Sequence, residues 1–394
     1  MRLALLSACL LLATSASAQD AAHKLAQDAI IVDTHIDAPS MLLERWSELA
    51  GEVKDREFDY VKARQGGLDV AFMSVYTSPE QDASGTAWQT ANTMIDAVEA
   101  MVQRHPEKFA ILTSPKDAQR LLAGGRVLLP LGMENGAPLV DKLENVQFFF
   151  DRGVRYITLA HSAPNRIADS SYAAEKKWNG LSPFGKQVVA EMNRVGIMVD
   201  VSHLGDASAM EAIRLSKVPV IASHSAFRHF TPGFERNISD EIAKAVAASG
   251  GVVQVPFGTM FISPESAADG QAYFRARQAF DDNNAALKAQ GKPQEDGAAF
   301  EKAWAAAHPP RVSTLKQVLD QIDYGVKLIG IDHIGLGSDF DGVGGELATG
   351  LTSVADYPNL VVGLQARGYK DADIRKILGG NLLRTWAAIE AGAR

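Results

Sequence analysis

Short apolar runs recur along this chain, and most of them are followed by a polar or amphipathic stretch. Eight such runs occupy residues 29–37, 68–77, 126–134, 154–161, 196–203, 219–225, 251–258 and 333–342. They are nearly continuous and rich in valine and isoleucine, which is typical of parallel strands buried on both faces. Amphipathic helices are predicted between many of them, as at 182–195, 239–249 and 313–329. Strands that alternate with helices in this way predict an α/β fold, a (β/α)8 barrel of the TIM type.

The segment from about residue 259 to residue 312 breaks the alternation, because it is polar, rich in alanine and partly helical. It follows the seventh predicted strand and leaves the barrel at the end where active sites form. We expect an insertion over the mouth of the barrel, which acts either as a lid or rim of the site or as a plain excursion over the surface. The rest of 19–394 is expected to form a single catalytic domain.

The first residues have the pattern of a cleavable export signal. Arg2 precedes an almost wholly apolar run at 4–13, and Ala-Ser-Ala at 16–18 is a small-residue cleavage site. The run is too short to span a membrane. We therefore expect residues 1–18 to be removed, and the mature protein to begin at Gln19 in the periplasm or outside the cell, without a stable membrane anchor. An uncleaved N-terminal anchor is the alternative.

Composition excludes several classes of function. The 394 residues carry a net charge of −8 and no basic run, which argues against nucleic acid as a partner. The single cysteine, Cys9, lies in the expected signal, so the mature chain would have no disulfide and no thiolate ligand. Ser202, Ser223 and Ser225 flank histidines, but the G-x-S-x-G elbow of a serine hydrolase is missing. Gly-rich phosphate loops and dinucleotide-binding fingerprints are missing as well.

Ionisable side chains gather at the ends of the predicted strands. They are His35, Asp37, Glu134, His161, His203, His224 and Asp339. Strand ends converge at one face of a barrel, so these four histidines and three carboxylates are expected to meet there. Burying such groups without partners is costly, and a metal ion would compensate them. The nitrogen and oxygen ligands suit zinc, and also manganese, cobalt or iron.

Several segments, in this order, resemble the membrane dipeptidase family, which is peptidase family M19 of the amidohydrolase superfamily. They are DTHID (33–37), GVRYITLAH (153–161), GLSPFGKQVVAEMNRVGIMVDVSH (180–203), VIASHS (220–225), RNISD (236–240), IDHIGLGSDFDG (331–342) and ILGGNLLR (377–384). The resemblance runs from about residue 29 to residue 386. One H-x-D motif is a weak signal, whereas the ordered set with GLSPFG and GSDFDG is specific.

The resemblance implies a (β/α)8 enzyme with two zinc ions per chain. By position, the matches to the family's metal ligands are His35 and Asp37 for one ion, His203 and His224 for the other, and Glu134 as the bridge between them. A water or hydroxide would also bridge the ions and attack the substrate.

Three further residues match functional positions of the family. His161 matches the histidine that contacts the substrate carbonyl or its developing oxyanion. Asp339 matches the aspartate that transfers the proton, and Arg236 matches the arginine that binds the substrate carboxylate. The alternative for Arg236 is a surface arginine paired with Glu235 or Asp240.

The implied activity is metal-dependent hydrolysis of the amide bond of dipeptides, including those with a C-terminal D-residue, and of carbapenem β-lactams. Another amidohydrolase is the alternative, such as an N-acyl-amino-acid hydrolase, a lactonase or a phosphotriesterase. Arg236 is the residue that discriminates between these activities, because it favours a substrate with a carboxylate. An exported metal-binding or peptide-binding protein without activity would not need Asp339. The expected partner is a small dipeptide, and a homodimer would have to form without disulfides.

Overall fold

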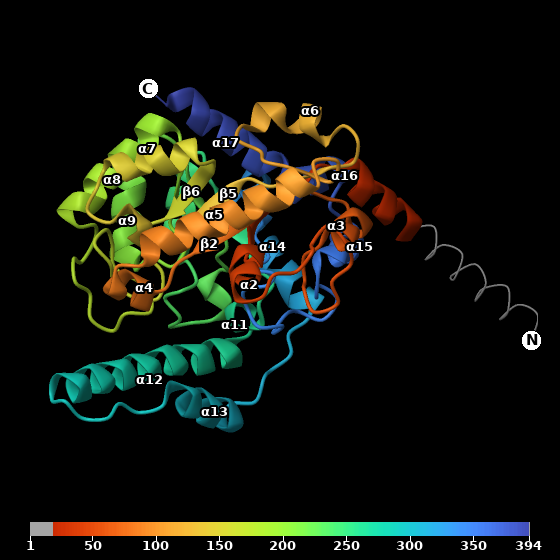
Figure 1. Cartoon of the computed structure of the whole chain (residues 1–394). Helices are drawn as coiled ribbons and strands as arrows, with labels where there is room; N and C mark the ends of the chain where they lie inside the picture. Colours follow the sequence, from red (N-terminus) through yellow and green to blue (C-terminus); the bar gives the residue numbers. More distant parts are fainter. Residues whose placement is uncertain (1–18, 394) are drawn as a thin grey trace, which may run out of the picture.

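Eight parallel strands close into a barrel in the computed structural model, which describes residues 19–393. The expected signal at 1–18 therefore lies outside the described residues. The barrel strands are β1 (Ile31–Ile36), β2 (Leu68–Tyr76), β5 (Leu131–Glu134), β6 (Val154–Thr158), β7 (Met198–Asp200), β8 (Val220–Ala222), β9 (Val252–Val255) and β10 (Ile334–Leu336). Closure is complete because β1 pairs with both β2 and β10. The predicted (β/α)8 barrel is confirmed (Figure 1).

Two short strands lie beside the barrel. They are β3 (Phe109–Ala110) and β4 (Val127–Leu128), and they extend the sheet in the order β2-β4-β3. The sequence predicts one strand over 126–134, but the structure divides this run into β4 and β5. Pro130 lies at the division, and it has no N–H to donate to a neighbouring strand.

Helices surround the barrel and connect its strands (Figure 1). Those outside the insertion are α2 (Ala38–Glu44), α3 (Tyr60–Gly66), α4 (Pro79–Ser84), α5 (Ala87–Arg104), α6 (Ala118–Leu122), α7 (Glu144–Asp151), α8 (Pro183–Val195), α9 (Asp206–Leu215), α10 (Asp240–Ala248), α14 (Leu315–Ile329), α15 (Tyr357–Ala366), α16 (Asp371–Arg375) and α17 (Asn381–Gly392). Residues 19–28 are also helical. Short 3-10 turns occupy Pro115–Asp117, Ala137–Leu139, Arg228–Phe230, Ile331–His333 and Val354–Asp356, and a π-helical turn occupies Lys376–Gly380.

Local sequence signals explain where the helices begin and end. The sequence predicts that α10 starts at Ser239 or Asp240 and stops at a glycine. In the structure the Ser239 hydroxyl accepts a hydrogen bond from the Ile242 N–H, and Gly250 follows the helix with a φ of 85°. A serine cap satisfies a free N–H of the first turn, and glycine adopts the left-handed conformation without strain.

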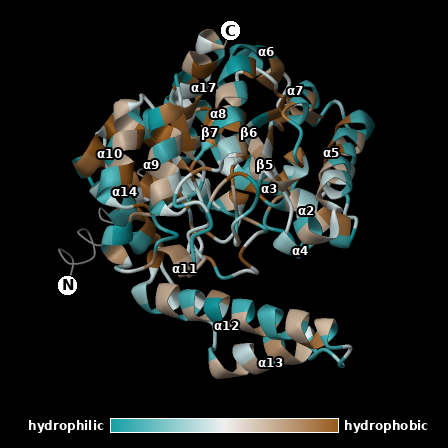
Figure 2. Ribbon diagram, turned by 90° about the vertical axis from the view of Figure 1, so that its left-hand side faces the viewer, coloured by the Kyte–Doolittle hydropathy of each residue, from teal (hydrophilic) through white to brown (hydrophobic). Residues whose placement is uncertain are grey.

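The insertion forms three helices after β9. They are α11 (Thr259–Ile262), α12 (Pro264–Ala289) and α13 (Gly297–Ala307). Both views show α12 and α13 as a pair that projects beyond the rest of the molecule (Figures 1 and 2). Only Ser266 and Ala267 of α12 are buried, and no residue of α13 is. The insertion is therefore buried against the barrel only at its first part, and a partly exposed ion pair joins Arg277, halfway along α12, to Glu80 of α4 at 4.0 Å.

The end of the barrel opposite the mouth is filled. Trp386 of α17 is fully buried and packs on Phe72 of β2, with 5.4 Å between ring centroids. Tyr156 of β6 lies beside Phe72 at 5.6 Å, so the aromatic side chains form a floor beneath the strand ends. Within residues 19–393, no helix is long and apolar enough to cross a membrane.

Candidate metal centre and active site

The predicted site residues meet at the mouth of the barrel. His35 lies in β1, and Glu134 is the last residue of β5. The other five lie in the turns that follow the strands: Asp37 after β1, His161 after β6, His203 after β7, His224 after β8 and Asp339 after β10. All are buried except His161, whose side chain is 16% exposed. The sequence thus correctly places these residues at the mouth of the barrel, but most of the strands are shorter than it predicts.

Glu134 lies at the centre of this cluster. Its Oε1 lies close to the Nε2 nitrogens of His203 (3.0 Å), His224 (3.3 Å) and His161 (3.4 Å). Its Oε2 lies 3.5 Å from the Nε2 of His35. The two carboxylate oxygens therefore face different histidines, which is the arrangement that a carboxylate between two ions requires.

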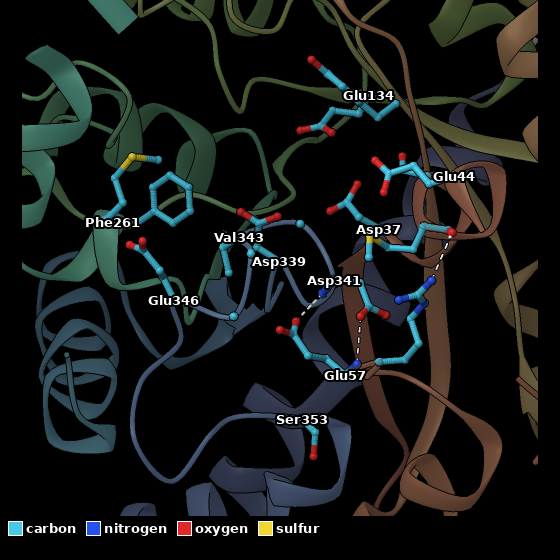
Figure 3. A pocket seen from close by; sticks show the side chains of 18 of the residues that line it. Asp37, Glu44, Glu57, Glu134, Phe261, Asp339, Asp341, Val343, Glu346 and Ser353 are labelled. Carbon is cyan, nitrogen blue, oxygen red and sulfur yellow. Dashed lines mark hydrogen bonds between the residues drawn. The ribbon is translucent and has the colours of Figure 1, made fainter. Parts of the chain in front are cut away.

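Three overlapping groups of side chains can bring ligand atoms within 4.8 Å of one another. They are His35 with Glu134 and His224, Glu134 with His161 and His203, and His35 with Asp37 and Asp339. Glu134, Asp37 and Asp339 enter the same hollow (Figure 3). The buried His35 Nε2 has no hydrogen-bond partner among the described residues, so the cluster fits a cation. The groups do not divide the ligands as the resemblance does, and that division stays a prediction.

The charge states of the central residues also suit a metal ion. Burial opposes ionisation of Glu134, but His161 and His35 hold its pKa well below the ordinary value. Burial lowers the pKa of His203 and of His224 well below the ordinary value, and neighbouring positive groups lower both further. Metal binding requires deprotonated ligands, and Glu134, His203 and His224 meet that condition. His35 would have to release a proton to the solvent on metal binding, because the effect of burial on its pKa is outweighed by Tyr156 and Glu134, which raise that pKa well above the ordinary value.

Asp339 differs from Glu134 in its environment. Burial raises its pKa well above the ordinary value; His35 opposes this shift, and the Asp37 carboxylate adds to it. Its backbone φ is 68°, and that of His203 is 66°. Left-handed conformations are uncommon outside glycine, cost about 1–3 kcal/mol and cluster at functional sites. Both residues with this conformation line the site.

Arg236 is buried beside the cluster, with only 2% of its surface exposed. Its Nη2 lies 3.0 Å from His203 Nε2, its Nη1 donates to Ser225 Oγ at 3.1 Å, and its guanidinium lies 4.8 Å from the centre of the Phe261 ring. Its Nε has no partner among the described residues. The alternative of a surface ion pair is wrong, since Glu235 instead pairs with Lys176 at 2.7 Å.

A cavity of about 1140 Å³ opens over the cluster (Figure 3). Its lining includes Glu134, His161, His203 and Asp339. One wall is aromatic and comes partly from the insertion: Phe261 of α11, Tyr273 and Phe274 of α12, and Tyr172. Phe274 packs against Tyr172 in a tilted arrangement, with 3.8 Å between ring centroids. The first part of the insertion therefore borders the site, and the remainder is an excursion.

Residues behind the cluster are not found by the sequence analysis. Asp33 accepts hydrogen bonds from the backbone N–H of His35 and of Ser338, at 3.0 and 2.9 Å. Tyr156 places its hydroxyl 2.7 Å from His35 Nδ1, and only a glycine at 132 leaves room for its ring. An aspartate two or three residues before a histidine, as in DTH (33–35) and DVSH (200–203), is a signal for such residues. Tyr156 has no such signal.

Comparisons with known proteins identify the family of the chain. The family described as "Membrane dipeptidase (Peptidase family M19)" matches residues 19–394. Dipeptidase verJ of Clonostachys rogersoniana is 27% identical over 94% of this chain and 86% of its own length. An uncharacterized dipeptidase of Schizosaccharomyces pombe is 29% identical over 95% of this chain and 83% of its own.

Two solved structures are similar as well. The probable dipeptidase PvdM from Pseudomonas aeruginosa has a TM-score of 0.80 at 28% identity, over 96% of this chain and 99% of its own. A metallopeptidase from Rhodobacter sphaeroides, liganded with a phosphinate mimic of the dipeptide L-Ala-D-Ala, has a TM-score of 0.72 at 23% identity. It covers 91% of this chain and 99% of its own.

Proposed function

The chain belongs to the membrane dipeptidase family, peptidase family M19, and from this premise we propose that it is a binuclear zinc dipeptidase. Its substrates would be dipeptides with a free amine and a free carboxylate, including those with a C-terminal D-residue. Carbapenem β-lactams, which contain a strained amide and a carboxylate, are part of the same proposal. Export without a membrane anchor and assembly as a homodimer without disulfides are also part of it, and rest on the sequence alone.

The observation that carries this proposal is the position of Glu134. Its Oε1 faces His203 and His224 at 3.0 and 3.3 Å, while its Oε2 faces His35 at 3.5 Å. Two zinc ions would be held by these residues together with Asp37. When bound, they supply Lewis acidity, which polarises the scissile carbonyl and lowers the pKa of water from about 15.7 toward 7.

The chain's own residues then orient the substrate and move the proton. His161 is more exposed than the other histidines of the cluster, so its imidazole can reach the carbonyl oxygen and stabilise the negative charge that develops there. Asp339 would accept the proton of the attacking water and deliver it to the leaving amine, because its carboxylate lines the cavity beside His35 and Asp37. Arg236 would bind the substrate carboxylate.

The function is tested with a panel of substrates that differ in one group at a time. We expect the purified protein to hydrolyse free dipeptides. It should cleave the corresponding N-acyl amino acids, which lack the free amine, and lactones, which lack the free carboxylate, at least about 100-fold less well, because a site built to bind these groups is left with unpaired polar atoms. The measurement is kcat/KM for each substrate, with both configurations of the C-terminal residue. Faster turnover of N-acyl amino acids or lactones than of any dipeptide would contradict the proposal.

Arg236→Lys should lower kcat/KM on dipeptides roughly 10- to 100-fold, because a hydrogen bond to a charged group contributes about 1.5–3 kcal/mol and lysine lacks the two-pronged donor. Amidating the C-terminus of the dipeptide should cost the wild type a similar factor, and the two changes should not add.

A matched control for this change is Arg228→Lys. Arg228 lies in the same loop and binds Asp206 through both Nη atoms at 2.7 and 2.6 Å, away from the cluster. The Arg228→Lys substitution should leave the preference for free-acid over amidated dipeptides unchanged. Equal turnover of free-acid and amidated dipeptides by the wild type would refute carboxylate recognition.

A further inference from the structure

Asp200 is a fully buried carboxylate directly behind the histidine cluster, and the proposed reaction does not use it. Its Oδ1 accepts hydrogen bonds from the backbone N–H of Ser202 at 3.1 Å and of Ser223 at 2.8 Å. Its Oδ2 accepts from the hydroxyls of Ser223 and Thr158. These four donors contact both oxygens and hold the side chain in place.

The Ser223 hydroxyl connects this carboxylate to His224. Its oxygen lies 2.6 Å from Asp200 Oδ2 and 2.8 Å from His224 Nδ1. An ionised carboxylate can only accept hydrogen bonds, so the single hydroxyl proton of Ser223 goes to Asp200. The Ser202 hydroxyl, at 3.5 Å, is a much poorer acceptor for that proton. The Ser223 oxygen must then accept a hydrogen bond from the His224 Nδ1–H.

This direction of hydrogen bonding determines the tautomer of His224. With the proton on Nδ1, the other nitrogen, Nε2, carries a lone pair. That nitrogen lies 3.3 Å from Glu134 Oε1 and 2.8 Å from His203 Nε2, at the centre of the cluster. The lone pair of His224 therefore points to the place where the proposed function requires an ion.

We propose that Asp200 and Ser223 are positioning residues that hold His224 as the Nδ1–H tautomer and so keep its Nε2 free to bind a divalent cation. The inference rests on the proposed function, since it assigns these residues to the same metal centre. Outer partners of this kind orient a metal-binding histidine, and their loss lowers metal affinity about 10- to 100-fold. The serine between carboxylate and histidine extends the usual direct contact by one hydrogen bond.

Asp200→Asn should reverse the direction of the relay. The two backbone N–H groups at Oδ1 select the amide oxygen for that position, so the amide NH2 takes the place of Oδ2. There it would donate to the Ser223 oxygen, whose own proton would turn to His224 Nδ1. A neutral His224 would then carry its proton on Nε2, the nitrogen that faces Glu134. A substitution that hardly changes the shape of the side chain would thus block the ligand atom.

The experiment compares the wild type with Asp200→Asn, Ser223→Ala and Thr158→Val. Zn²⁺ affinity is measured by competition with a chromophoric chelator, and folding by thermal unfolding. Thr158→Val is the matched control, because it removes a hydroxyl donor from the same Asp200 oxygen but does not lie between Asp200 and His224. We expect the first two variants to bind the ion that His224 holds about 10- to 100-fold less tightly than the wild type does. The affinity of the control should stay within about threefold of the wild-type value.

A second readout is the tautomer itself. In metal-free protein labelled with 15N-histidine, the His224 nitrogens, assigned with a His224→Asn sample, should show protonation at Nδ1 in the wild type and at Nε2 in Asp200→Asn. This readout keeps the proposal testable where a variant is less stable than the wild type. The opposite tautomer in the wild type would overturn the proposal.

The outcomes separate this inference from the proposed function. Unchanged Zn²⁺ affinity in both relay variants, with dipeptide hydrolysis intact in the wild type, overturns the relay and leaves the function standing. An equal loss in Thr158→Val also overturns it, because the effect would then come from disturbing a buried polar group. A wild type that binds Zn²⁺ and loses it in the two relay variants, but cleaves no dipeptide, supports the relay and refutes the proposed function.

Discussion

Glu134→Gln should remove both the bound metal and the dipeptidase activity. The amide keeps the shape of the side chain but places an NH2 group where one oxygen now faces the histidines, at 3.0 Å from His203 or at 3.5 Å from His35. An NH2 group cannot bind a cation, and the negative charge that the lowered pKa of Glu134 preserves would be lost. We expect a loss of Zn²⁺ affinity larger than the roughly 100-fold effect of outer partners.

The measurement is the zinc content after dialysis, together with kcat/KM on a dipeptide that the wild type cleaves. Glu57→Gln is a matched control in the same cavity: Glu57 lies in the lining, and its carboxylate accepts a hydrogen bond from the Asp341 N–H. Burial raises the pKa of Glu57 to about 7, so its charge is already reduced near neutral pH. The control should keep its zinc. Retention of both ions by folded Glu134→Gln would show that Glu134 is not the bridge.

The barrel and the location of the site could be predicted because both follow from short-range patterns. Each buried parallel strand appears as an apolar run, and a functional side chain directly after such a run must lie at the mouth of the barrel. His35 and Glu134 lie near the ends of their strands, and His161 and His224 lie in the turns just after theirs, so all four are at the mouth of the barrel. The position of each residue relative to the apolar runs therefore predicted which residues would meet.

The orientation of the side chains could not be predicted in this way. Alternation along a strand says which way a residue points only while the strand continues, and β7 and β10 end three residues before His203 and Asp339. The left-handed backbone at these two positions depends on tertiary contacts, such as the hydrogen bond from the Asp339 N–H to the His35 carbonyl at 3.1 Å. No local pattern encodes a contact between residues so far apart in the chain.

Burial of charged residues was also beyond the sequence analysis. Arg236 follows Glu235 and precedes Asp240 closely, so local charge suggests an exposed ion pair, yet the loop turns Arg236 inward against His203. Helix α12 shows the reverse case. Its 26 residues have little apolar periodicity, because its buried residues lie only at one end. The length of the helix and the contact of Phe274 with Tyr172 therefore could not be predicted.

Asp339→Asn should retain zinc close to the wild-type amount and lose roughly 100-fold or more in kcat, since the amide cannot accept the proton that the reaction transfers. The substitution is mild for the backbone, because asparagine tolerates the positive φ of 68° as well as aspartate does. It also nearly preserves volume, which matters because the Asp339 carboxylate packs against Gly342 so closely that a Cβ there would lie 2.5 Å from Oδ1.

Asp341→Asn is a matched control, two residues further along and also at a positive φ, 63°. Its carboxylate accepts hydrogen bonds from the backbone N–H groups of Glu57 and Phe58, at 2.8 and 3.3 Å, and is not in the ligand cluster. We expect it to lose less than about tenfold in kcat, because it affects only the hydrogen bonds that hold this part of the cavity wall.

The alternative role of Asp339 is that of a metal ligand. Its carboxylate can approach the ligand atoms of His35 and Asp37 within 4.8 Å, so the three side chains could bind one ion. A ligand and a proton acceptor differ in what Asp339→Asn loses first. If Asp339 is the base, zinc content and the melting temperature of the zinc-loaded protein stay near wild type while kcat falls. If zinc is lost from a variant that remains folded, Asp339 belongs to the metal centre, and the proton must be transferred by another group in the cavity.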